Sequence, residues 1–139
     1  MCDYDESLGG SLQVDGKIIT TGDLLWTNQN PTSSFAQQQI TINELENYDE
    51  FEIYYYSNTS RKTMSSTKML KNINSTMNVI FQWDNHGNVG NRDIIWISST
   101  KIQFNDAVTI IVNDVFNRGA NNSWGVPLYI VGYKTGLFN

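Results

Sequence analysis

Apolar and polar residues alternate along much of this chain with the two-residue period of a β-strand. The clearest example is residues 50–57, where Phe51, Ile53 and Tyr55 share one face. Alternation of this kind, or a short apolar run, predicts further strands at residues 24–26, 37–42, 61–70, 79–83, 93–98, 101–104, 107–113 and 127–133.

The alternation also predicts which side chains point inward. Over residues 107–113 it directs Val108, Ile110 and Val112 toward the core. Lysines in residues 61–70 are typical of an edge strand, because charge discourages pairing with other chains. The tryptophans that fall in apolar strands are expected in the core: Trp26, Trp83 and Trp96.

Turn residues separate these strands. The pair Asp15-Gly16 lies between two apolar runs and predicts a hairpin over residues 11–19, because Asp-Gly favours a type I′ turn. Residues 1–10 are acidic and then Gly-rich, so we expect an N-terminal arm there, followed by one domain over residues 11–139. The polar stretches 84–88 and 117–123 are expected to be loops.

About nine to ten short strands with no segment of helical period predict an all-β fold, an antiparallel β-sandwich of jelly-roll-like form. A chain of 139 residues fits one domain. Aromatic residues make up 12% of it, which supplies enough apolar area for a core without disulfides. The one cysteine, Cys2, lies at the terminus and has no partner for an intramolecular disulfide.

Charge and hydropathy argue against two classes of partner, nucleic acids and membranes. The formal net charge is −5, so neutralisation of nucleic-acid phosphates is not expected. The one basic run, from Arg61 to Lys71, is interpreted as a solvated face. The sequence contains no apolar run near 18 residues and no signal-peptide pattern, so no membrane insertion is expected.

Catalytic and metal-binding patterns are weak. The one histidine, His86, lies in a polar loop and is interpreted as a surface residue rather than the base of a triad. Acidic and amide residues around it do not have the spacing of a calcium loop. Asp49, Glu50 and Glu52 cluster, but the adjacent side chains of Asp49 and Glu50 would point to opposite faces of a strand. These carboxylates are therefore interpreted as solvated residues at a strand edge rather than a glycosidase pair. We therefore expect no enzymatic activity, no metal and no cofactor.

Aromatic residues beside amides are the remaining candidates for a binding site. Trp124 follows Asn121 and Asn122 in a loop, where an indole could stack on a sugar while the amides bond its hydroxyls. The alternative is that Trp124 caps the core. Tyr54 and Tyr56 lie on the strand face opposite Phe51, so they are either exposed to ligand or part of an oligomer interface.

Two segments carry a resemblance to a known family. The motifs LWTN at residues 25–28 and PTSSFAQ at residues 31–37 open the domain, and NN at 121–122 precedes VPLYIVGYK at 126–134. Together they resemble small β domains of tailed-phage and prophage structural proteins, of the tail-fibre or receptor-binding-tip type. The resemblance covers residues 24–136.

The resemblance implies a protein of the virion, assembled in the host cytoplasm. It implies a tail-fibre or baseplate tip that binds host-surface saccharide, forms a homotrimer and contacts other virion proteins. It carries over no catalytic residue. Two alternatives stay open: a capsid-decoration or head-fibre protein without ligand, and a cellular carbohydrate-binding module.

Overall fold

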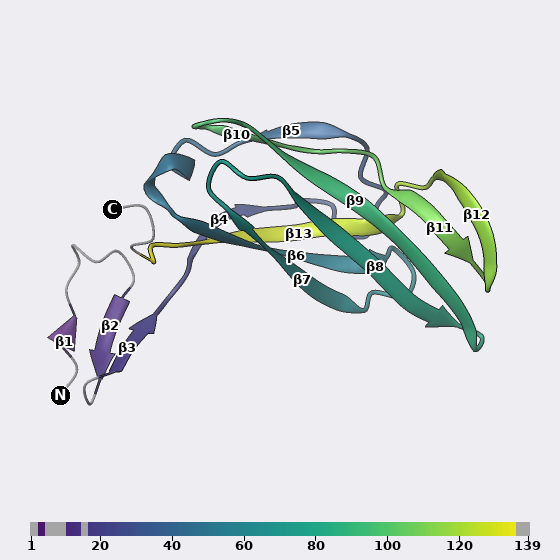
Figure 1. The fold of residues 1–139 in the computed structure, drawn as a ribbon, viewed down its shortest axis with the longest axis horizontal. Coiled ribbons are helices and arrows are strands. Elements are labelled where there is room, and N and C mark those ends of the chain that lie inside the picture. The colour runs from purple at the N-terminus through teal and green to yellow at the C-terminus, as the bar shows by residue number, and fades with distance from the viewer. Residues whose placement is uncertain (1–2, 5–10, 15–16, 136–139) are drawn as a thin grey trace.

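Antiparallel β-strands form nearly all of the regular secondary structure in the computed structural model, which describes residues 3–4, 11–14 and 17–135 (Figure 1). Within those ranges one short 3-10 helix, η2, spans Leu45–Asn47. The strands are β1 (Asp3–Tyr4), β2 (Ser11–Val14), β3 (Lys17–Thr20), β4 (Asp23–Thr27), β5 (Gln38–Thr41), β6 (Glu50–Asn58), β7 (Met64–Leu70), β8 (Ser75–Trp83), β9 (His86–Ser98), β10 (Lys101–Phe104), β11 (Val108–Val112), β12 (Val115–Ala120) and β13 (Trp124–Tyr133).

Two of the sheets form a β-sandwich, which confirms the predicted fold class. One has four strands in the order β4-β13-β6-β7, and the other has six, in the order β12-β11-β9-β10-β5 with β8 also paired to β9. The long strand β9 holds the six-stranded sheet together, because β8 pairs with one of its edges while β10 and β11 share the other. A separate three-stranded sheet contains β1, β2 and β3.

The core lies between the two sandwich sheets. Phe51, Ile53 and Tyr55 of β6 are each at most 4% exposed, so the predicted alternation in this strand is confirmed. Met77 and Val79 of β8 face them from the other sheet with no more than 1% exposure. Ring contacts join three further residues, Trp26, Phe35 and Phe104. Phe35 meets each of the other two rings edge-to-face, and the rings of Trp26 and Phe104 are tilted against each other.

One buried charge joins β9 to two loops. The guanidinium of Arg92 is fully buried, and it donates to the carbonyl oxygens of Gly125 (2.8 Å), Asn105 (2.7 Å) and Trp124 (3.0 Å). It also lies 5.5 Å from the ring centroid of Phe35. Burial lowers the pKa of Arg92 to about 10, so it remains charged at neutral pH. Arg92 therefore fixes the β10–β11 connection and the start of β13 against the central strand.

Two expectations about burial are wrong. Leu24, expected in a buried strand, is 65% exposed because β4 is an edge strand and this side chain lies on its outer face. Trp83, expected in the core, is 43% exposed because it is the last residue of β8, where the core gives way to an open hollow. Trp26 and Trp96 are partly buried and pack against the core as expected.

The prediction of which β11 side chains point inward is correct only at Val112, the last residue of the strand, which packs against the core. Near the start of the strand, Thr109 is buried instead of the predicted Val108 and Ile110. The register shifts between Thr109 and Ile111 in the pairing with β9, which reverses the faces on its two sides. A period-two pattern cannot anticipate such a bulge.

Both expected loops are shorter than predicted. His86 already begins β9, which leaves a two-residue turn, and residues 115–120 form strand β12 rather than part of a loop. The hairpin expected at residues 11–19 is confirmed by the antiparallel pairing of β2 with β3, in which Val14 is opposite Lys17. Its turn residues, Asp15 and Gly16, lie outside the described residues.

The division into an arm over residues 1–10 and a domain over residues 11–139 stays a prediction. Strand β1, inside the proposed arm, pairs with β2. Across the described part of the chain, no helix is long and apolar enough to span a membrane.

Candidate functional site

Three hairpin turns border one end of the sandwich. The β8–β9 turn contains Asp84 (φ 49°) and Asn85 (φ 63°), and the β11–β12 turn contains Asn113 (φ 49°) and Asp114 (φ 67°). Two successive positive φ angles define a type I′ turn, and Asn and Asp tolerate this backbone better than other residues with a side chain. The third turn joins β6 to β7.

These turns surround a hollow of about 250 Å³. In Figure 1 the ends of β8 and β9 and the β11–β12 hairpin project at this end of the molecule. The walls combine aromatic rings with side-chain amides, and they come from four strands and two turns: Asn58, Ser60, Phe81, Trp83, Asn88, Asn113 and Trp124. An apolar surface with a few convergent polar groups is the usual composition of a small-ligand site.

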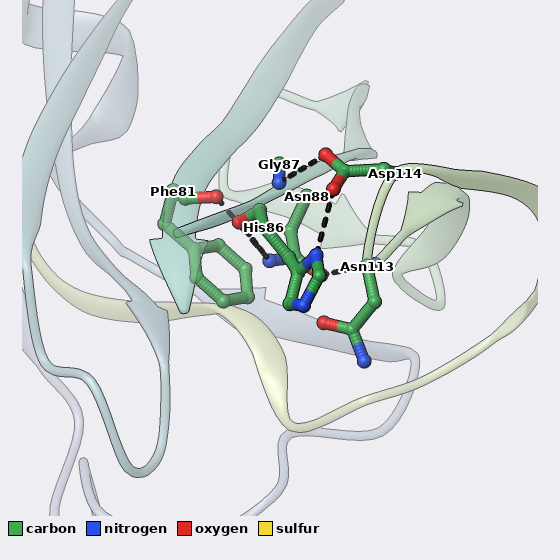
Figure 2. A network of polar contacts seen from close by, with 6 residues as sticks. All are labelled: Phe81, His86, Gly87, Asn88, Asn113 and Asp114. Carbon is green, nitrogen blue, oxygen red and sulfur yellow. Dashed lines mark hydrogen bonds and ion pairs between the residues drawn. The ribbon is translucent and has the colours of Figure 1, made fainter. Parts of the chain in front are cut away.

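A histidine–carboxylate pair ties two of the turns together (Figure 2). His86 Nδ1 lies 2.7 Å from Asp114 Oδ2, and the backbone N–H of Gly87 donates to Asp114 Oδ1 at 2.6 Å. These two hydrogen bonds lower the pKa of Asp114 below its usual range. The pair therefore holds the β11–β12 turn against the start of β9.

A buried amide supports the same wall. Asn88 is 3% exposed, and its Nδ2 donates to the carbonyl oxygens of His86 (3.1 Å) and Phe81 (3.4 Å). Its Oδ1 accepts from the backbone N–H of Asn113 at 3.1 Å. Asn88 thus positions the two hairpins, while the Asn113 side chain, whose amide makes no hydrogen bond within the described residues, is available to a ligand (Figure 2).

Two tryptophans have different roles in the hollow. Trp124 is 6% exposed and meets the Phe81 ring edge-to-face at a centroid distance of 5.0 Å, so it forms the floor. Trp83 is 43% exposed and stands at the rim. The guanidinium of Arg61 lies 5.8 Å from the Trp83 ring centroid, which adds a cation–π contact and a positive charge beside the indole.

The predicted loop site is only partly present. Of its three residues, only Trp124 lines the hollow, and its burial matches the alternative in which it caps the core. Asn122 uses both ends of its amide internally, accepting from Ala107 N–H and donating to Asp106. Asn121 Oδ1 accepts from Ser123. Asn122 with its whole amide and Asn121 with its Oδ1 therefore hold the loop together.

Tyr54 and Tyr56, the other predicted residues, lie on the outer face of the four-stranded sheet, away from the hollow. Tyr54 stacks on Tyr129 at a centroid distance of 4.7 Å. Its hydroxyl donates to Glu52 Oε1 at 3.0 Å, and Tyr133 donates to the same oxygen at 2.9 Å. Both tyrosines of the prediction are partly buried, so this face remains open to either interpretation, ligand or interface.

Acidification is expected to weaken the fold through Glu52. Burial alone would raise the pKa of Glu52, but hydrogen bonds from Ser66, Tyr133 and Tyr54 lower it below its usual value. A lowered folded-state pKa stabilises the protein above the unfolded-state pKa, and this contribution disappears as pH falls through the folded-state value. Glu52→Gln should therefore flatten the loss of thermal stability between about pH 5 and pH 3.

Thermal unfolding of wild type and Glu52→Gln across that pH range checks this expectation. Glu46→Gln, which changes an exposed carboxylate, is the matched control and should follow wild type. Parallel pH profiles for wild type and Glu52→Gln would show that the network contributes nothing to acid stability.

The residues missed by sequence reasoning come from separate segments. Asn58, Asn88 and Asn113 lie in or beside three different hairpins, so no local motif joins them. The pairs Asp84-Asn85 and Asn113-Asp114 were the available signals, because Asn and Asp tolerate the positive φ angles of a type I′ turn.

The groups that line the hollow are side-chain amides, one hydroxyl and aromatic rings, with the His86–Asp114 pair beside them and Arg61 next to Trp83. Within the described ranges, no three His, Cys, Asp or Glu side chains gather as a metal site. Among those residues the imidazole has one side-chain hydrogen bond, with Asp114, and no hydroxyl bonds its Nε2 as a triad would require.

No family model matches the chain, and neither a curated protein nor a solved structure shows significant similarity to it.

Proposed function

We propose that this domain is a non-enzymatic saccharide-binding module whose site is the hollow beneath Trp83. The observation that carries the proposal is the exposed indole at the rim of an amide-lined hollow. An exposed indole offers an apolar face and an N–H donor together, so its position beside side-chain amides favours a binding role.

The groups around the hollow suit a sugar ring. The C–H face of a pyranose packs on an indole, while its hydroxyls need donors and acceptors at fixed positions. Asn113 supplies both kinds through its amide, and His86 presents its second ring nitrogen at the same end of the sandwich. Arg61 adds a positive charge beside Trp83, which favours saccharides that carry carboxylate or phosphate.

Binding without cleavage fits the residues that line the hollow. Glycoside hydrolysis ordinarily uses two carboxyl groups that flank the bond, and no Asp or Glu is among the described residues that line it. Asp114, nearby, is engaged by His86 and Gly87.

The setting we propose is a phage or prophage virion, in a tail-fibre or baseplate tip that contacts host-surface saccharide. This part rests on the resemblance of residues 24–136. A hollow of about 250 Å³ holds little more than one sugar ring, so a single site should bind weakly. Repeated copies on one particle would then supply adhesion through multivalency.

The half-buried tyrosines support one alternative. Tyr54, Tyr129 and Tyr133 gather around Glu52 on an outer sheet face, and interfaces are enriched in tyrosine. A capsid-decoration or head-fibre protein would use this face against another virion protein and would bind no saccharide. A cellular carbohydrate-binding module would share the hollow and differ in its genomic setting.

Removal of the rim indole should abolish saccharide binding. We expect Trp83→Ala to weaken binding at least ~30-fold, since truncation of a central tryptophan at an interface typically costs about 2 kcal/mol or more. The fold should survive because Trp83 is already 43% exposed. The measurement is binding to an array of bacterial surface oligosaccharides, followed by titration with the best-bound compound.

Ile97→Ala is the matched control, because Ile97 is 42% exposed and does not line the hollow. It should bind as wild type does. Wild-type protein that binds no oligosaccharide on the array, or equal affinities of wild type and Trp83→Ala, would reject the proposed site. Cleavage of a bound oligosaccharide would reject the non-enzymatic reading.

A further inference from the structure

An apolar row crosses the outer face of the six-stranded sheet. The strand registers place Ile80 opposite Val89, Val89 opposite Ile111, and Ile111 opposite Phe116. Both neighbours of Ile80 along β8 are buried, so these four side chains point away from the core. Ile80 is 72% exposed and Phe116 is 73% exposed, which leaves the row open to solvent.

The row ends at an unprotected strand edge. β12 is the last strand of its sheet, and all six of its residues are exposed. Proteins usually protect such an edge with lysine or proline, as Lys68 does on β7, but β12 has neither. Its one charged residue is Arg118.

Alternate residues of β12 direct their backbone groups outward. The register between β11 and β12 shifts between Phe116 and Gly119, so the contacts on both sides of the shift are needed. Val115 is opposite Val112, and the carbonyl oxygens of Asn117 and Gly119 both accept from Thr109 Oγ1, so odd-numbered residues of β12 face β11. The N–H and C=O groups of Phe116, Arg118 and Ala120 therefore point to the free side. These groups can pair with another strand without disturbing the hairpin.

We propose that β12 pairs antiparallel with β12 of a second copy of this chain, about a two-fold axis at Asn117. In this register Phe116 is opposite Arg118 of the partner subunit, and the same contact recurs across the axis. Each guanidinium then lies beside an aromatic ring, and two pairs of backbone groups exchange hydrogen bonds.

The occupant is a second copy because the edge is complementary to itself. In a two-fold contact, if residue 116 of one copy is opposite residue 118 of the other, then residue 118 of the first is opposite residue 116 of the second. The Phe–Arg pairing therefore occurs twice, and no like charges lie opposite each other. One strand and one row form a small contact, in the class below about 1,200 Å², so we expect micromolar affinity. A two-fold contact at this edge gives dimers, so it does not test the predicted homotrimer, which stays a prediction.

A cysteine at the axis tests the register. In a Cys2→Ser background, Asn117→Cys should form a covalent dimer under mild oxidation. The reason is that residue 117 pairs with itself at a Cα separation of about 4.5 Å, within disulfide range. Val115→Cys on the same strand is the control and should cross-link at least ~10-fold more slowly. Equal rates for the two variants would overturn the proposed pairing.

Charge at position 116 gives a second, independent readout by sedimentation equilibrium. Phe116→Arg would face Arg118 of the partner subunit and should raise the dimer dissociation constant at least ~30-fold, whereas Phe116→Glu should leave it within about threefold. Ile73→Arg, on another exposed surface, should match wild type. A monomeric wild type at millimolar concentration, or equal effects of Arg and Glu at position 116, would overturn the proposal. Neither test involves saccharide, so failure here leaves the proposed binding site untouched.

Discussion

Arg92→Met is expected to lower the free energy of unfolding by about 4 kcal/mol, which corresponds to a melting temperature lower by roughly 10–15 °C. Methionine fills a similar volume but cannot donate a hydrogen bond. The buried carbonyl oxygens of Gly125 and Trp124 and the partly buried one of Asn105 would then lose this donor. Each unsatisfied acceptor costs about 1–3 kcal/mol, which outweighs the gain from removing a buried charge.

Chemical denaturation followed by tryptophan fluorescence measures this effect. Arg92→Lys should also destabilise, because one ammonium group cannot reproduce the fork that spans three carbonyls. Lys101→Met removes an exposed charge from β10 and should change stability by less than about 0.5 kcal/mol. An Arg92→Met variant as stable as this control would show that the guanidinium is not needed to fix the two loops.

Gly90→Ala is expected to lower the free energy of unfolding by about 2–3 kcal/mol. An added Cβ would lie 2.6 Å from the backbone oxygen of Val108 and 2.9 Å from the Trp124 ring. The oxygen belongs to a paired strand and cannot move alone, so β11 or the indole must shift. Because Trp124 forms the floor of the hollow, the same substitution should also reshape the binding site.

Gly119→Ala is the matched control for this prediction. A Cβ at position 119 would meet only Thr109 Oγ1, at the ordinary contact distance of 3.9 Å. Its stability should lie within about 0.5 kcal/mol of wild type. Equal losses of stability in the two alanine variants would show that close packing at Gly90 is not the cause of its effect.

Sequence reasoning located the strands that have two chemically different faces. In β6, buried residues alternate with polar residues and tyrosines along the whole strand, so its position and its inward face could both be predicted. β10 was predicted with its observed bounds, Lys101–Phe104, for the same reason. Periodicity succeeds where an opposing sheet covers one face of the whole strand.

Periodicity failed to predict burial where burial depends on how far the opposing sheet extends. Trp83 continues the alternation of β8 but lies at the strand's end, beside the hollow, and a period of two carries no information about where the core stops. β12 was missed because Asn, Arg and Gly weaken its strand signal. The bulge at Ile110 reversed the phase of β11.

The candidate site could not be predicted for a related reason. Its amides, Asn58, Asn88 and Asn113, come together only through pairing between strands distant in sequence. The predicted loop asparagines were plausible from local composition. In the fold they are used to hold their own loop and its neighbour in place.

The central claim is that saccharide binds in the hollow beneath Trp83, and NMR of the four indole N–H groups tests it most directly. The titrant is the oligosaccharide best bound on the array. We predict that the Trp83 indole signal shifts most, that Trp124 shifts less because it is buried in the floor, and that Trp26 and Trp96 stay unchanged. Unchanged Trp83 and Trp124 signals at saturation, with shifts elsewhere, would contradict the claim.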